Sequence, residues 1–198
     1  MRRIAPLAAA AVLAAAAGCG TATASPGAAP PGRPTPGAFA REASAAFNDA
    51  DVAFLQMMIP HHRQGMRMAG LAAERATRPD VRALGAAVAA TQGDEVRDMT
   101  MWLLGWRRPL DAAPHAHDEH ARLHATDPAG IDALGRLTGA RFEQTFLNML
   151  IAHQHNAVEM ARTETRTGVS PEAKDLARRI DLSRTAQIRQ MLGQLGTG

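Results

Sequence analysis

The sequence has few of the residues from which disulfide-linked proteins and β-sheet proteins are built. Its 198 residues include one Cys, no Tyr, two Trp and five Phe. A single Cys excludes an intramolecular disulfide framework and a zinc site made of several cysteines. Strands favour aromatic and β-branched residues, whereas Ala, Leu and Met favour helices. Because 46% of the residues are hydrophobic, the chain can bury a core, and we expect an all-α protein.

The chain also lacks the excess of positive charge that binding to nucleic acid requires. Its formal net charge is only +3, and Arg2 and Arg3 contribute to it. These two residues precede an apolar run that ends at Gly18, as in a secretory signal peptide. The run is too short for a transmembrane helix, which needs about 20 apolar residues. Removal of residues 1–18 lowers the net charge to about +1, so we predict no nucleic-acid partner.

The only cysteine, Cys19, directly follows this segment. The small residues 16–18 before it resemble the bacterial lipobox, in which the signal is removed before a cysteine that becomes lipid-modified. We therefore predict lipidation of Cys19, attachment to the membrane through this lipid and a location on the extracytoplasmic side. Cleavage after Ala24 without lipidation is the alternative. Residues 19–40 are rich in Pro and Gly, which predicts a disordered tether.

The rest of the chain, residues 41–198, contains an internal duplication. At an offset of 92 residues, Phe54 faces Phe146, and residues 54–61 (FLQMMIPH) align without a gap with residues 146–153 (FLNMLIAH). Chance similarity between two Ala- and Leu-rich helices is the alternative, but coincident Pro, His and Met residues argue against it. Each half predicts a helical hairpin, and two hairpins form a four-helix bundle. The halves span about 48–105 and 138–198, and a His-rich connection at 106–137 joins them. We expect helices over about 48–77 and 79–104, a third that follows Thr138 and runs to about Thr167, and a last one that opens at Ser170-Pro171, with a short helix from Asp127-Pro128.

One stripe of the first helix in each half carries histidine and methionine. Successive helical residues turn by about 100°, which brings Met57, His61 and Met68 to one side of the helix. The duplicate stripe consists of Met149, His153 and Met160. If the hairpins pack about a pseudo-two-fold axis, two imidazoles and up to four thioethers meet in the core.

These side chains are neutral, soft to borderline donors. They suit Cu(I) or Ag(I) better than Mg²⁺, Ca²⁺ or Mn²⁺. The alternative is a metal-free core in which methionines fill irregular gaps and the histidines are simply hydrogen-bonded. For His61 and His153, which recur at equivalent positions, both interpretations stay open.

Further histidines lie outside these stripes. His62 shares another stripe with Met58, while the second half has Gln154 at the equivalent position and His155 beside it. A second, asymmetric site and a hydrogen-bonded histidine are the alternatives there. The connection holds four more histidines, a density that binds Cu(II), Zn²⁺ or Ni²⁺ unless the segment is only a polar linker. These are His115, His117, His120 and His124.

Catalytic signatures are missing from the sequence. A ferritin-like di-iron centre needs Glu three residues before His, and none precedes His61, His62, His153 or His155 in this way. The patterns of zinc proteases, serine hydrolases and phosphate-binding loops are also absent. We therefore predict that the protein is not an enzyme.

The segment around these histidines resembles a known family. Residues 54–69, with Met57-Met58-Ile59-Pro60-His61-His62, resemble the signature of the bacterial domain-of-unknown-function 305 family, and residues 92–102 resemble its second-helix motif. The resemblance covers roughly residues 48–195 and implies a ferritin-like four-helix bundle. Some exported members of the family are associated with copper. The ligand candidates that it implies are His61, His62, Met57, Met58 and Met68 in the first half, and His153, His155, Met149 and Met160 in the second.

The second half departs from this pattern. Arg184 and Gln187 stand where Gln92 and Glu95 stand in the first half. If these residues orient metal ligands, the second half is the weaker site. Taken together, the sequence predicts an exported lipoprotein that binds and buffers copper, as Cu(I). The alternative is a metal-free structural or interaction module of the cell envelope.

Overall fold

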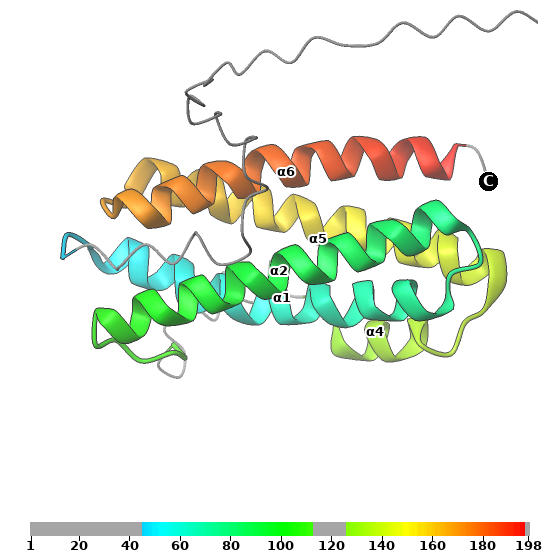
Figure 1. Cartoon of the computed structure of the whole chain (residues 1–198), viewed down its shortest axis with the longest axis horizontal. Coiled ribbons are helices and arrows are strands. Elements are labelled where there is room, and N and C mark those ends of the chain that lie inside the picture. Colours follow the sequence, from blue (N-terminus) through cyan, green and yellow to red (C-terminus); the bar gives the residue numbers. More distant parts are fainter. Residues whose placement is uncertain (1–44, 113–125, 197–198) are drawn as a thin grey trace, which may run out of the picture. The chain divides into compact units, whose positions relative to one another are not determined.

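The computed structural model describes residues 45–112 and 126–196, which form helices and no strand (Figure 1). The predicted signal segment, the predicted tether with Cys19 and the four histidines of the connection lie outside these ranges. No helix in the described ranges is long and apolar enough to cross a membrane. The predicted all-α bundle of two hairpins is confirmed. Its helices are α1 (Asp49–Arg75), α2 (Pro79–Gly105), α4 (Pro128–Leu134), α5 (Gly139–Thr167) and α6 (Pro171–Leu195).

Several helices begin at the residues that the sequence indicates. The Asn48 side chain accepts a hydrogen bond from the Asp51 amide at 3.0 Å, and the Asp51 carboxylate accepts one from the Asn48 amide at 2.7 Å. This capping box satisfies two amides that the first turn leaves without helical partners. The side chains of Asp127 and Ser170 cap α4 and α6, while Thr138 makes no such bond at the start of α5.

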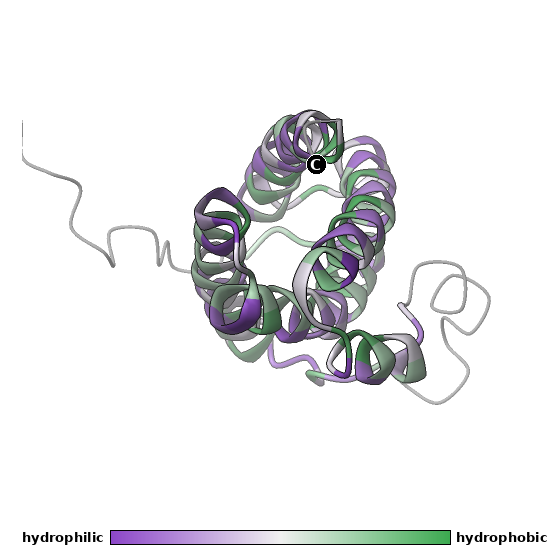
Figure 2. Ribbon diagram, turned by 90° about the vertical axis from the view of Figure 1, so that its right-hand side faces the viewer, coloured by the Kyte–Doolittle hydropathy of each residue, from purple (hydrophilic) through white to green (hydrophobic). Residues whose placement is uncertain are grey.

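The first helices of the two hairpins, α1 and α5, run antiparallel and carry most of the core between the halves. One apolar cluster joins Leu55 near the start of α1 to Ala161 near the end of α5. The other joins Ala72 near the end of α1 to Phe146 near the start of α5. The end-on view shows the four long helices around a common centre (Figure 2). Positions 61 and 153 lie between the two clusters along their helices, midway through the bundle.

Two buried carboxylates connect the hairpins in a reciprocal way. Asp51 in α1 accepts hydrogen bonds from the amides of Val169 and Ser170, in the turn between α5 and α6, at 3.0–3.2 Å. Glu143 in α5 accepts from the amides of Thr77 and Arg78, in the turn between α1 and α2, at 2.7 and 2.8 Å. The equivalent positions are Asp51 and Glu143, Thr77 and Val169, and Arg78 and Ser170, and each pair is 92 residues apart. The duplication seen in the sequence is therefore also a symmetry of the contacts.

One end of the bundle differs from the other by an extra buried carboxyl group. Glu164 is only 1% exposed and lies beside Asp51, whereas the equivalent residue of the first half is Ala72. Gly168 makes room for it, because a Cβ atom there would approach a Glu164 carboxyl oxygen to 2.0 Å. Burial, together with the neighbouring Asp51 carboxyl, raises the pKa of Glu164 to about 8. Glu164 is therefore protonated at neutral pH and hydrogen-bonds to Asp51.

This carboxyl pair predicts that stability is lost as the pH rises from about 4.5 to about 8. Because the folded-state pKa of Glu164 lies above its ordinary value of 4.5, folding retains a proton that the unfolded chain releases, and stability falls as pH rises towards about 8. Urea unfolding between pH 6.5 and 9 should show the free energy of unfolding decreasing up to about pH 8 and then levelling. Glu164→Gln should remove this decrease, and Glu159→Gln, at an exposed position of α5, should keep it. An equal decrease in the Glu164→Gln variant would contradict the assignment.

Candidate metal site

The two equivalent histidines of the duplicated stripes meet in the core. His61 of α1 and His153 of α5 stack face to face, with ring centroids 3.7 Å apart and ring planes 10° from parallel. They are 4% and 1% exposed. Because they occupy equivalent positions on antiparallel helices, their contact lies at the pseudo-two-fold axis of the duplication. The sequence stripes predicted this meeting.

The stacked arrangement does not place both rings to bind one ion. The lone pair of an imidazole nitrogen lies in the plane of its ring, so two parallel rings direct their lone pairs across the line that joins them. An ion bound by both rings would need at least one imidazole to rotate out of the stack. The stack therefore brings the imidazoles of His61 and His153 together, but both lone pairs can point at one ion only after one of the rings rotates.

His153 is held at one nitrogen and open at the other. Its Nδ1 lies 2.8 Å from the Thr126 hydroxyl oxygen, while no described residue lies within hydrogen-bonding distance of its Nε2. Burial, reinforced by the Arg184 charge and by the protonated form of His62, lowers the pKa of His153 to about 3. The ring is therefore neutral at ordinary pH, which is the form that binds metal ions.

The open nitrogen of His153 faces α1 at a glycine. A Cβ atom on Gly65 would lie 2.7 Å from His153 Nε2 and 2.3 Å from Gln92 Oε1. Both groups therefore approach the α1 backbone at the point where the helix has no side chain. The Gln92 amide is fully buried, and neither its oxygen nor its nitrogen has a hydrogen-bond partner among the described residues. Two polar groups with unused capacity thus lie on either side of Gly65.

His62 belongs to a separate buried network. Its Nε2 lies 2.8 Å from Glu95 Oε2, and Arg184 of α6 forms an ion pair with the same oxygen. Arg184 is 0% exposed. Burial lowers the pKa of His62 although Glu95 opposes this. Burial tends to raise the pKa of Glu95, but the His62 hydrogen bond and the Arg184 charge outweigh it and lower that pKa. The network then consists of one ion pair and a neutral imidazole that donates to the carboxylate.

The equivalent positions of the other half carry amides in place of charges. Gln154 replaces His62 and donates to Gln187, which replaces Glu95, at 2.6 Å. Gln92 stands at the position equivalent to Arg184. Only the first copy therefore joins the two hairpins through an ion pair. In the second copy the Gln154–Gln187 bond stays within one hairpin, and Gln92 has no hydrogen-bond partner among the described residues.

The methionines are divided between the two apolar clusters. Met58 and Met160 are buried in the first and Met68 in the second, while Met57 and Met149 are only partly buried at their margins. Met68 and Met160 each lie seven residues from the histidine of their own helix, about 10 Å along its axis. Met57 and Met149 each lie one helical turn from the histidine of their own helix, as Met58 does from His61.

The other candidate residues lie elsewhere. His155 is exposed on α5. Within residues 45–112 and 126–196, no group of three or more His, Cys, Asp or Glu residues is arranged to hold a metal ion.

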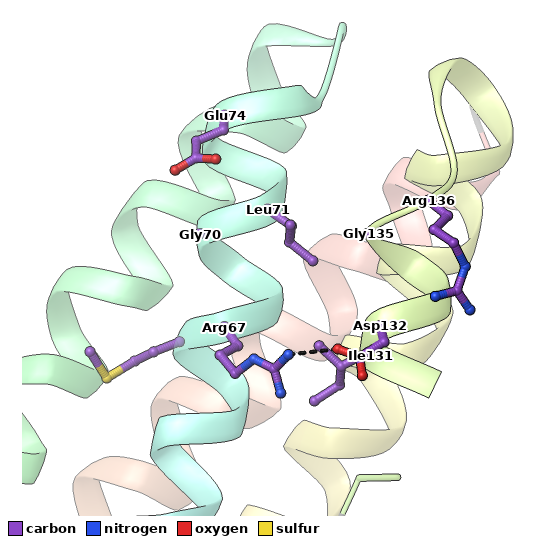
Figure 3. Close-up of a pocket in the computed structure, with 9 residues that line it drawn as sticks. Arg67, Gly70, Leu71, Glu74, Ile131, Asp132, Gly135 and Arg136 are labelled. Atoms are coloured by element: carbon purple, nitrogen blue, oxygen red, sulfur yellow. Dashed lines mark hydrogen bonds and ion pairs between the residues drawn. The ribbon is translucent and has the colours of Figure 1, made fainter. Parts of the chain in front are cut away.

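A surface groove of about 610 Å³ lies between α1 and α4, away from the histidine pair (Figure 3). Arg67 and Asp132 form an ion pair of 2.8 Å across it, and Leu71 and Ile131 also line it. The Arg67–Asp132 ion pair and the hydrogen bond from Arg75 to the Gly135 carbonyl oxygen attach α4 and the turn after it to α1.

The sequence and the fold are both similar to those of known proteins. The sequence profile of the family described as "Domain of unknown function (DUF305)" matches residues 51–195. The chain belongs to the DUF305 family. No curated protein gives a significant match. A DUF305 protein from Streptomyces coelicolor, described as secreted, is 27% identical, with a TM-score of 0.71 over 75% of this chain and 93% of that one. A DUF305 fragment from Deinococcus radiodurans is 30% identical, with a TM-score of 0.68 over 76% and 98%.

A metal-binding protein is also among the similar structures. CopM in its Cu(I)-bound form is 29% identical, with a TM-score of 0.64 over 74% of this chain and 96% of that one. CopM has also been solved in Cu(II)-bound, Ag-bound and apo forms. The fold of this DUF305 protein is therefore shared with a protein that binds copper and silver.

The sequence alone does not identify all the residues that surround the pair. It points to Gln92, Glu95 and Arg184 but not to the ion pair of Arg184 with Glu95 across the hairpins, and not to Gly65 and Thr126. Gly65 gave only a weak signal, because a glycine lowers the stability of any helix and Gly70 of the same helix has nothing within 4 Å of its Cβ position. Thr126 had none, since it lies in the connection and reaches His153 only through the fold.

The close approach at Gly65 predicts a sharp effect of one methyl group. Gly65→Ala should displace the Gln92 amide and the His153 ring and lower the free energy of unfolding by about 1–3 kcal/mol, as overpacking of a core does. Gly70→Ala in the same helix is the control, because nothing lies within 4 Å of its Cβ position. That variant should be neutral or more stable by about 0.4–1 kcal/mol. Urea unfolding of both variants measures this, and equal stabilities would show that the space at Gly65 is not restricted.

Proposed function

We propose that this protein binds and buffers copper, as Cu(I), in the core of the bundle and has no catalytic activity. The observation that carries the proposal is the contact of His61 and His153, two neighbouring imidazoles buried at the centre of the fold. The binding of Cu(I), Cu(II) and silver by CopM, a similar structure, supports the choice of metal.

The chemistry of the pair favours a monovalent ion. A neutral imidazole at His153, and thioethers one turn away at Met57 and Met149, are donors that suit Cu(I) and Ag(I). Because these ligands carry no charge, a monovalent ion brings one buried charge into the core, whereas a divalent ion brings two. The carboxylate of Glu95, which would favour harder ions, is engaged by Arg184 and His62. The site would hold the ion as cargo after an imidazole leaves the stack.

We further propose that the protein acts at the extracytoplasmic side of the membrane, anchored by a lipid on Cys19. The support is the signal-like segment and the lipobox resemblance of residues 16–19. The related Streptomyces protein, described as secreted, agrees with export.

Metal titration tests the core site. The purified protein should bind Ag(I), or Cu(I) under anaerobic conditions, in competition with a chelator of known affinity. The double variant His61→Ala, His153→Ala should lose the tightest site. His155→Ala, at an exposed position on α5, is the matched control and should bind as the wild type does.

Three outcomes would contradict the core site in different ways. Unchanged binding by the double variant would remove the pair from the site. Loss of binding only after deletion of residues 115–124 would place the site in the connection. No binding by the wild-type protein would favour the metal-free module of the cell envelope.

Fractionation of cells tests the anchor. The wild-type protein should be found with membranes and be extracted by detergent. Cys19→Ala should prevent lipidation and release the protein from the membrane fraction, because lipid chains supply the attachment. Membrane association that persists in this variant would contradict lipid anchoring.

A further inference from the structure

Thr126 connects the chain before α4 to both first helices. Its amide donates to Gln64 Oε1 of α1 at 3.1 Å, and its hydroxyl oxygen lies 2.8 Å from His153 Nδ1 of α5. The next residue, Asp127, caps α4, and α4 is held to α1 by the Arg67–Asp132 ion pair. The Thr126 hydroxyl group is therefore held beside His153 Nδ1 by the bond from its own amide to Gln64 and by the attachment of α4, which begins two residues later.

The hydrogen bond from Thr126 decides which nitrogen of His153 carries the proton. A neutral imidazole has one N–H group and one lone pair. If the Thr126 hydroxyl donated to Nδ1, the N–H group would be at Nε2, buried with no acceptor among the described residues. If Nδ1–H donates to the Thr126 oxygen, Nε2 keeps only a lone pair. Buried N–H groups without acceptors are the rarer and costlier case, so the second arrangement is favoured.

We propose that Thr126 is a positioning residue that holds His153 in the tautomer with a proton on Nδ1 and so presents the Nε2 lone pair to the bound ion. The inference rests on the proposed copper site and assigns its tautomer control to a residue outside the duplicated helices. His153 Nε2 lies beside Gly65, where a Cβ atom would approach it to 2.7 Å and would approach Gln92 Oε1 to 2.3 Å. Only the lone pair of an imidazole binds a metal ion, so the opposite tautomer would have to change before binding.

The tautomer is measured first, on the metal-free full-length protein, by nitrogen-15 NMR of the histidine rings. In the wild type, His153 should show a protonated Nδ1 and an unprotonated Nε2. Thr126→Val keeps the shape of the side chain but removes the hydroxyl group, so Nε2 should become the protonated nitrogen in a larger share of molecules. Thr126→Ser should restore the wild-type pattern. A protonated Nε2 in the wild type, or an unchanged pattern in Thr126→Val, would overturn the inference.

Binding of Ag(I) is measured second. Thr126→Val should bind about 10–100-fold more weakly, the usual effect of removing a group that orients a ligand, while Thr126→Ser should bind close to wild type. Thr165→Val is the matched control, because the Thr165 hydroxyl bonds only to the Ala161 carbonyl oxygen of its own helix. Equal binding by Thr126→Val and wild type would overturn the inference even if the tautomer changed.

The two measurements separate the two proposals. If the wild-type protein binds no Ag(I), the proposed copper function fails, and so does the part of the inference that concerns an ion. The NMR experiment still decides whether Thr126 sets the tautomer of His153. If the wild type binds Ag(I) but Thr126→Val is unaffected, the copper site stands and the role of Thr126 falls.

Discussion

The face-to-face contact of His61 and His153 sets the register between the two halves of the molecule. Because equivalent residues meet there, the antiparallel crossing of α1 and α5 becomes a pseudo-two-fold axis, and the remaining contacts between the hairpins follow from it. Asp51 and Glu143 reach the turn of the opposite hairpin at matching positions. A shift of one residue along either helix would rotate the histidines out of the core by about 100° and break both sets of contacts.

Where the two halves depart from this symmetry, they differ in buried charge and in bound protons. The network of His62, Glu95 and Arg184 is ionic, whereas its counterpart around Gln154 and Gln187 is neutral. Glu164 likewise adds a proton-bearing carboxyl at one end only. A buried ion pair is seldom a large source of stability. The fixed Arg184 charge nevertheless distinguishes the two halves around the histidine pair, because the network around His62 is charged and the one around Gln154 is neutral.

Much of this could be read from the sequence because it is local. Helix type, caps and the His and Met stripes depend on residues three to four positions apart, and the offset of 92 residues related the halves. The stripes correctly placed His61 against His153. They did not place the methionines, because a shared helical face says nothing about height along the axis. Met68 lies about 10 Å from His61 along the axis of α1. The stripes also left two interpretations of His62 open, a second metal site and a hydrogen-bonded histidine. In the structure His62 is hydrogen-bonded to Glu95.

The sequence by itself determined the all-α bundle and its duplication, and it placed His61 and His153 at equivalent positions that meet if the hairpins pack about a pseudo-two-fold axis. Only the tertiary structure decided what each buried polar group contacts: the pairing of Arg184 with Glu95 of the other hairpin, the meeting of Glu164 with Asp51, and the hold of Thr126 on His153. The physical reason is range. Helix formation and amphipathic patterning act within a few turns, whereas desolvation makes a buried charge or proton depend on whichever distant residue the fold brings within about 3 Å.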